Sequence, residues 1–160
     1  MTFEAQSTWT LENTSELFDP SLVQGFDETD AVGTIGSPDN VTNLRVSLER
    51  NDWNFNYYLQ YVSETDDSQF VDEEDSYFGF EPAYFDITMD KVFYHNVSVM
   101  YVQDKWDFLV GINNLLDEDP DVVSDVFRGM VGANKSNVPV SASQYDVLGR
   151  RLFARFNFRF

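Results

Sequence analysis

The chain has 160 residues, enough for one ordinary domain, and a formal net charge of -18. Its apolar content of 42% excludes a wholly disordered chain, and its acidic balance excludes nucleic acid as a partner, because phosphate binding needs clustered Lys and Arg. It contains no Cys, which excludes a disulfide framework, thiol catalysis and Cys-ligated metals.

Alternation of apolar and polar residues with a period of two predicts six β-strands along the chain. The third predicted strand is the clearest example, because Trp53, Phe55 and Tyr57 alternate with Asn54 and Asn56. The six strands are expected at residues 2–12, 42–49, 53–61, 93–101, 106–113 and 151–160. The sequence has no run of about 18 apolar residues, so it predicts no transmembrane helix. Strands that cross a bilayer, however, carry a much weaker hydropathy signal.

The connections between these strands are of two kinds. Residues 50–52 and 103–105 predict short hairpin turns, whereas about 13–40, 63–90 and 116–148 predict long loops. The long loops hold 22 of the 28 acidic residues and only two of the ten basic ones. Short turns at one end of a sheet and long loops at the other are typical of transmembrane β-barrels.

The side chains suggest which face of each strand meets lipid. Trp53 and Trp106 each follow a short turn on the apolar face, where an interfacial aromatic girdle is expected. Arg45 and Arg155 lie in mid-strand on the polar face. An Arg on the lipid face near the midplane costs about 2–4 kcal/mol, so the polar face is expected to point into the barrel and the apolar face to lipid.

Six strands are fewer than the roughly eight of the smallest closed membrane barrels. Each unpaired backbone group in hydrocarbon costs several kcal/mol, so two open edges are not tolerated there. The predicted fold is therefore all-β: an antiparallel, up-and-down transmembrane β-barrel segment that belongs to a larger barrel or assembles with other chains.

Three stretches in order resemble one family. "WDFLVGINNLLDEDP" at 106–120 resembles the penultimate-strand signature of TonB-dependent outer-membrane receptors, with Asn114, Leu115 and Asp117 matching and Leu116 in place of the usual Phe. "YHNVSVMYV", which starts at Tyr94, resembles the strand before it. "YDVLGRRLFARFNFRF", at the end of the chain, resembles the closing strand through its Tyr-Asp element, the Gly-Arg-Arg run that starts with Gly149 and Arg150, and the alternation that leads to a terminal Phe. "VTNLRVSLERNDWNFNYYLQY" fits the preceding hairpin less specifically.

The resemblance implies a 22-stranded barrel around a plug domain, which imports scarce ligands across the outer membrane of a Gram-negative bacterium. Residues 1–160 would form its last six strands, without plug, TonB box or signal peptide. The implied partners are the remaining barrel and plug, outer-membrane lipid, the barrel assembly machinery and, through the missing N-terminal part, the TonB complex. The terminal Phe156, Phe158 and Phe160 resemble the signal by which barrel proteins are recognised for assembly, and they also read as a lipid-facing strand.

Aromatic residues in the middle loop are candidates for ligand contact and equally for packing within the loop. They are Phe70, Tyr77, Phe78, Phe80, Tyr84 and Phe85. An acidic vestibule repels anions, which leaves cationic, neutral or sugar ligands more plausible.

No metal site or catalytic centre is predicted, and the chain is expected to be a non-enzyme without a cofactor. Asp117, Asp119 and Asp121 have calcium-loop spacing, but Val122 and Arg128 stand where such a loop needs Gly and Glu. Weak divalent-cation binding is conceivable at the acidic run of the middle loop, which comprises Asp66, Asp67, Asp72, Glu73, Glu74 and Asp75. The one His, His95, lies on the apolar face and is expected at the membrane interface rather than in a triad.

Two alternatives stay open from the sequence. One is a soluble, acidic β-sandwich that binds sugar or calcium, with a half-buried antiparallel sheet. The other is a porin-like diffusion channel whose barrel assembles from several chains. Partition into detergent separates the first from a membrane protein, and conductance separates the second from a plugged receptor.

Overall fold

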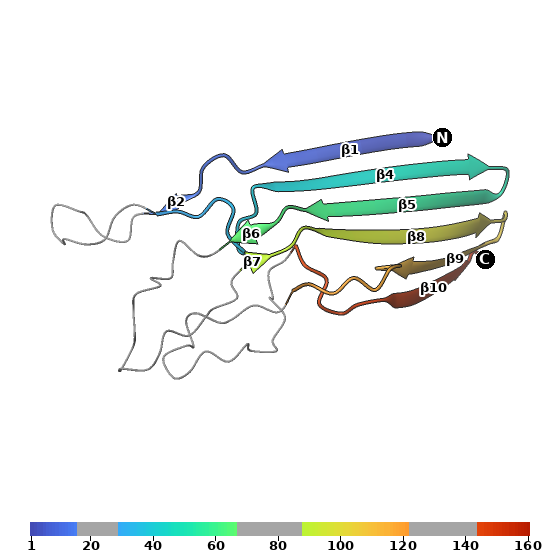
Figure 1. The fold of residues 1–160 in the computed structure, drawn as a ribbon. Coiled ribbons are helices and arrows are strands. Elements are labelled where there is room, and N and C mark those ends of the chain that lie inside the picture. The colour runs from blue at the N-terminus through green and yellow to red at the C-terminus, as the bar shows by residue number, and fades with distance from the viewer. Residues whose placement is uncertain (16–28, 67–87, 122–143) are drawn as a thin grey trace.

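The computed structural model describes residues 1–15, 29–66, 88–121 and 144–160, which form strands and no helix. One six-stranded antiparallel sheet dominates (Figure 1), with the strands in the order β1-β4-β5-β8-β9-β10. The strands are β1 Thr2–Trp9, β4 Asn40–Arg50, β5 Trp53–Val62, β8 Val92–Val102, β9 Trp106–Asn113 and β10 Arg151–Phe158. The prediction of an all-β fold with six antiparallel strands is confirmed. The first predicted strand was too long, since β1 ends at Trp9 rather than at residue 12.

Both short turns lie at one end of the sheet, which we call the turn end, together with the two chain termini (Figure 1). Arg50 pairs with Trp53, so Asn51 and Asp52 alone make the first turn. Asn51 has a φ of 53°, in the left-handed region that Asn tolerates better than most residues. The turns are joined, since the Val102 amide donates to the Asp52 carbonyl at 2.8 Å.

The long connections leave from the opposite end, which we call the loop end. Two small ladders begin there: β2 Thr14–Ser15 pairs with β3 Thr29–Asp30, and β6 Thr65–Asp66 pairs with β7 Thr88–Met89. The described residues contain no helix that would be long and apolar enough to cross a membrane.

The register confirms how the sequence divides the two faces. Directly opposed residues of neighbouring strands lie on the same face of a sheet. One continuous row of opposed residues runs across all six strands: Phe3, Val46, Tyr57, Val97, Ile112 and Leu152. Glu4, Arg45, Tyr58 and Asn96 form a corresponding row on the other face. The predicted apolar and polar sets are therefore two separate faces.

The buried core lies on the polar face, at the loop end. Val62 and Val92 are opposed on that face, and segments 31–39 and 144–148 fold over it. The cluster comprises Ile35, Val62, Met89, Val92, Tyr94 and Tyr145, with Val41 packed against it. By contrast, the large apolar side chains of the opposite face are exposed, with Phe3 at 63% and Phe156 at 62%.

Candidate functional site

An aromatic belt runs along the apolar face at the turn end. Trp53 lies 4.7 Å from Tyr101, Tyr101 lies 5.6 Å from Trp106, and Trp106 lies 6.0 Å from Phe156, between ring centroids. The two predicted girdle residues are thus brought together through Tyr101, which the sequence did not single out. The strand register could have identified Tyr101 as part of the belt, because Tyr101 stands directly opposite Trp53.

The predicted assembly-signal residues extend this belt to the edge of the sheet. Phe156 and Phe158 lie on β10, and the Phe160 ring lies 5.3 Å from that of Phe158 in an edge-on arrangement. All three side chains are exposed. The rings therefore form an open apolar surface rather than a packed layer.

His95 and Tyr57 satisfy one another on the apolar face. The Tyr57 hydroxyl lies 2.8 Å from His95 Nδ1, and both side chains are half-buried. Their directly opposed neighbours are apolar, because Leu59 stands opposite His95 and Val97 opposite Tyr57. A paired imidazole and phenol are far cheaper to remove from water than two unpaired groups.

The polar face carries a hydrogen-bonded and ionic network. Arg45 lies 3.8 Å from Glu4 and 6.0 Å from the centre of the Tyr58 ring, whose hydroxyl donates to Asn43 at 2.5 Å. Near the turn end, the buried Asp107 carboxylate accepts a hydrogen bond from Asn157 at 2.7 Å and from Arg159 at 3.1 Å. The network supplies neighbours for buried polar atoms that a second apolar layer would leave unpaired.

Phe153 differs from the other Phe residues of β10, Phe156 and Phe158, because it lies on the polar face of the strand. It stands directly opposite Gly111 of β9, and its ring occupies the space where a Cβ of that residue would lie. Because Gly111 has no side chain, the Phe153 ring can occupy this space.

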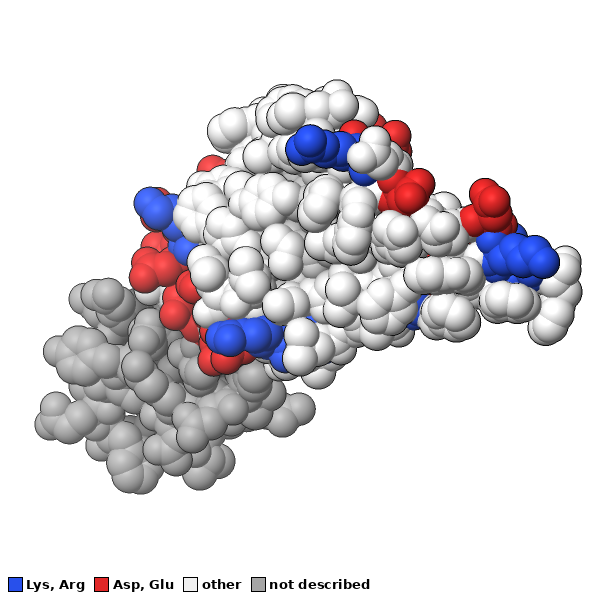
Figure 2. All heavy atoms as spheres, turned by 90° about the vertical axis from the view of Figure 1, so that its right-hand side faces the viewer, with Lys and Arg blue, Asp and Glu red and all other residues white. Residues whose placement is uncertain are grey.

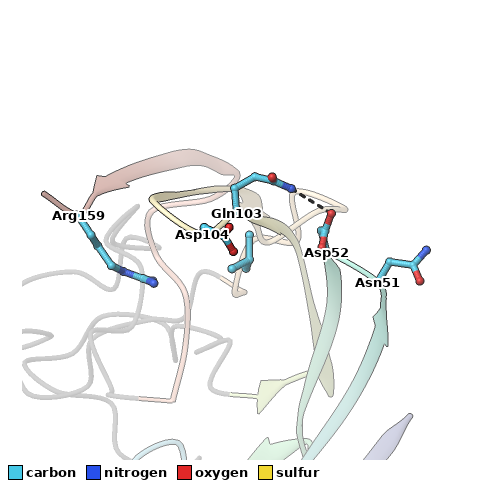
Figure 3. A pocket seen from close by; sticks show the side chains of 6 residues that line it. Asn51, Asp52, Gln103, Asp104 and Arg159 are labelled. Atoms are coloured by element: carbon cyan, nitrogen blue, oxygen red, sulfur yellow. Dashed lines mark hydrogen bonds between the residues drawn. The ribbon is translucent and has the colours of Figure 1, made fainter.

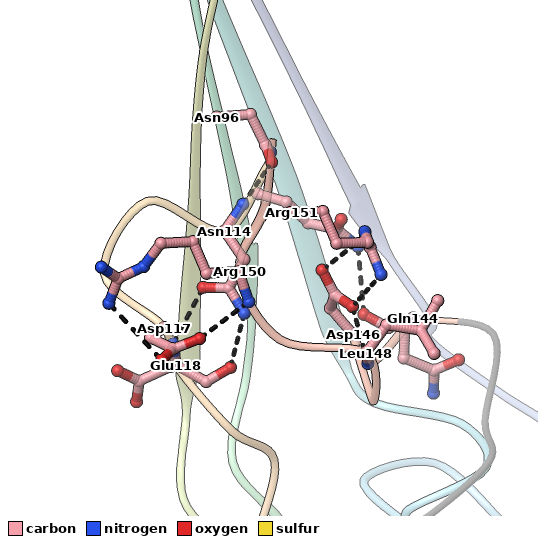
Figure 4. Close-up of polar contacts among 10 residues, drawn as sticks. Asn96, Asn114, Asp117, Glu118, Gln144, Asp146, Leu148, Arg150 and Arg151 are labelled. Carbon is pink, nitrogen blue, oxygen red and sulfur yellow. Dashed lines mark hydrogen bonds and ion pairs between the residues drawn. The ribbon is translucent and has the colours of Figure 1, made fainter. Parts of the chain in front are cut away.

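The predicted family-motif residues meet at the loop end of β9 and β10, in what we call the strand-end cluster (Figure 4). Asn114 is fully buried and clamps the chain, because its Oδ1 accepts from the Glu118 amide at 2.9 Å and its Nδ2 donates to the Glu118 carbonyl at 2.8 Å. The Asn114 amide donates to Asn96 Oδ1 at 2.9 Å, and the Leu115 amide to the His95 carbonyl at 2.7 Å.

Asp117 connects this clamp to the entry of β10. Its Oδ1 accepts from the Arg150 amide at 2.7 Å, and the Arg150 guanidinium lies 3.4 Å from Oδ2. Gly149 has a φ of 67°, and a Cβ there would lie 3.2 Å from Asp117 Oδ1. Arg151, the second Arg of the Gly-Arg-Arg run, adds a bidentate pair with Asp146 at 2.9 and 2.8 Å.

One feature that the sequence did not predict is an open pocket at the turn end (Figure 3). It has a volume of about 410 Å³ and is lined by Asn51, Asp52, Val102, Gln103, Asp104 and Arg159. Figure 2 views the molecule from this end. It shows small groups in which basic and acidic side chains lie next to one another, with broad uncharged surface between the groups. The turn end therefore presents no field of a single sign to attract a charged ligand.

Several predicted residues lie outside the described part of the chain. These are the six loop aromatics Phe70, Tyr77, Phe78, Phe80, Tyr84 and Phe85, and all of the acidic run except Asp66. Where the chain is described, no group of three or more His, Asp or Glu residues is placed to hold a metal ion. Asp121 Oδ2 accepts from the Asp90 amide at 2.7 Å, so it contacts the chain itself.

Comparison with known proteins adds no family. The chain matches no protein-family model, no curated protein and no solved structure.

Proposed function

We propose that this chain forms the last six strands of a TonB-dependent receptor barrel in the outer membrane of a Gram-negative bacterium, and that it works in ligand uptake only within the complete barrel. One observation carries the proposal. The broad apolar face of the sheet is left uncovered by the described residues, with Trp53 46% exposed, while the polar face bears the core and the network.

Water is a poor solvent for such a face. Each Å² of apolar surface left in water costs about 25 cal/mol relative to burial, and monomeric soluble proteins rarely expose contiguous apolar patches of more than a few hundred Å². Lipid removes this cost without a second protein layer. The soluble β-sandwich, in contrast, would need such a layer over Trp53 and Phe156.

The open edges support a larger barrel. β1 and β10 each pair on one side only, so one row of backbone groups on each is unpaired within the described sheet. In hydrocarbon each such group costs several kcal/mol, which neighbouring strands remove. The complete receptor would supply those strands and the plug.

The receptor class is supported by the motif residues. Asn114, Asp117, Gly149 and Arg150 resemble the family by sequence, and they contact one another as a single cluster where β9 and β10 meet the last long loop. The long acidic loops would form the outer vestibule, which favours cationic, neutral or sugar ligands over anions. The aromatic residues of 67–87 stay candidates for contact with them.

The test is fractionation of Gram-negative cells that produce the chain with an outer-membrane leader, followed by gel migration with and without boiling. We expect outer-membrane localisation and heat-modifiable migration. A compact, water-soluble monomer would contradict the membrane assignment.

A further inference from the structure

The two edge strands of the sheet are complementary to one another. Five antiparallel steps separate β1 from β10, so the two edges run in opposite directions. Both strands are eight residues long, and each presents an apolar and a polar face in the same sense. A β10 strand can therefore accept a β1 strand from another molecule as its next antiparallel neighbour, with both faces continuous.

Charge distinguishes the two edges on the polar face. β1 carries the acidic Glu4, held loosely by Arg45 at 3.8 Å with both side chains about three-fifths exposed (64% and 60%). β10 carries two arginines, Arg151 and Arg155, and Arg159 follows directly after the strand. Arg151 and Arg159 have carboxylate partners in Asp146 and Asp107, whereas Arg155 has no ion pair in the described part of the chain. One cation on one edge thus lacks a partner, and one anion on the other edge is weakly held.

We propose that, when the chain folds without the rest of a barrel, the open edge of β10 pairs antiparallel with β1 of a second copy, with Glu4 opposite Arg155. The inference rests on the membrane part of the proposed function. It goes beyond that proposal by naming the neighbour and the register. In this register Thr2 faces Asn157 and Thr8 faces Arg151.

The same register matches the apolar face. Phe3 and Phe156 are directly opposed, and each is now exposed, at 63% and 62%. Ala5 and Ala154, both small, are the next pair on that face. Cross-strand aromatic pairs and opposite charges each add about 0.2–1 kcal/mol to an antiparallel pair. A shift of two residues keeps the faces but places Glu4 opposite Asn157, and that register loses the charge pair.

The contact is head to tail, because it joins one edge to the other edge of the next copy. Such contacts close into rings or continue as open chains. Ring closure is favoured in hydrocarbon because it leaves no unpaired edge. A closed ring of two or more copies is therefore the expected product.

Engineered cysteines test the register directly, since the chain has none of its own. Opposed residues have Cα atoms about 4.5–5.5 Å apart, within the range of a disulfide. We expect Ala5→Cys mixed with Ala154→Cys, refolded in detergent, to give disulfide-linked dimers under mild oxidation. Ala5→Cys mixed with Phe156→Cys is the matched control for the shifted register and should give about tenfold less, because diagonal neighbours lie about 7–8 Å apart.

Charge exchange tests the pair. In the cysteine background, Arg155→Glu should lower the cross-linked fraction about tenfold, since it replaces attraction by repulsion, and Arg155→Lys should retain it. Because Arg155 is exposed and has no partner within the described sheet, neither change should alter monomer folding.

Two results would overturn the inference: a monomeric mass by light scattering in detergent together with no 5–154 disulfide, or preferential 5–156 linkage. Heat-modifiable migration of the same samples reports the membrane fold separately. If migration stays heat-modifiable while the chain is monomeric, the proposed function survives and the pairing of copies does not.

Discussion

The two faces of the sheet differ in what surrounds their side chains. On the polar face, Asp107, Tyr58 and Arg45 have partners from neighbouring strands, and loop segments cover the face at the loop end. On the apolar face, the described residues add no covering layer, and its rings contact mainly one another along the belt. The difference shows that, among the described residues, the polar face has packed and hydrogen-bonded partners and the apolar face has few.

The largest expected effect contrasts the faces at two neighbouring, exposed positions of β1. Ala5→Arg places a charge on the apolar face, and Gln6→Arg places the same charge on the polar face. In a bilayer we expect Ala5→Arg to lower the free energy of unfolding by about 2–4 kcal/mol and Gln6→Arg to change it little. Urea titration of the chain refolded into lipid vesicles measures both. Equal, small effects would mean that water covers both faces.

Much of this arrangement follows from the sequence, for a simple reason. A period of two assigns every side chain to a face as soon as a strand is recognised, and the six alternating runs are long enough to recognise. The short turns at 50–52 and 103–105 then fix neighbouring strands and their direction. The sequence therefore predicted the two faces of the sheet and the pairing of the strands that short turns connect.

The core at the loop end was not predictable in this way. Ile35 and Tyr145 come from loop segments far apart in the chain, where no periodicity reports their position. The Asn114 clamp was found only as a motif, because its function depends on a φ of 49° and on backbone groups of Glu118, neither of which leaves a pattern in composition. Likewise, the place of Tyr101 in the belt depends on its pairing with Trp53 across two strands and not on its neighbours in sequence.

A second prediction concerns the polar face at Phe153, the one aromatic residue on that face of β10. A Cβ at Gly111 would overlap the Phe153 ring and lie 2.7 Å from the Val97 carbonyl oxygen. We expect Gly111→Ala to lower the free energy of unfolding by about 1–3 kcal/mol, as overpacking does. Gly36→Ala is the matched control, since nothing lies within 4 Å of its Cβ position. Phe153→Ala in the Gly111→Ala background should restore part of the loss, because the clash with the carbonyl persists.

A third prediction concerns the strand-end cluster. Asn114→Ala removes both part-buried bonds to the Glu118 backbone, at a cost of about 1–3 kcal/mol for the two bonds together. Asn114→Gly loses the same bonds but relieves the left-handed backbone, so it should be about 1 kcal/mol less destabilising. Unfolding midpoints of the two variants, measured side by side, separate the contributions. Identical midpoints would show that the backbone conformation at this position carries no strain.

The smallest expected effect lies at the polar pair on the apolar face. Tyr57→Phe removes the hydroxyl that meets His95 Nδ1, and we expect a loss of about 0.5–1.5 kcal/mol in the free energy of unfolding. Tyr61→Phe is the matched control on the same strand and face, because its hydroxyl has no hydrogen bond within the described sheet; it should change little. A double-mutant cycle of Tyr57→Phe with His95→Leu then isolates the coupling between the two side chains. If lipid surrounds the pair, the coupling should be larger in vesicles than in a detergent that admits water, since an unpaired imidazole is costlier where no water can replace the phenol.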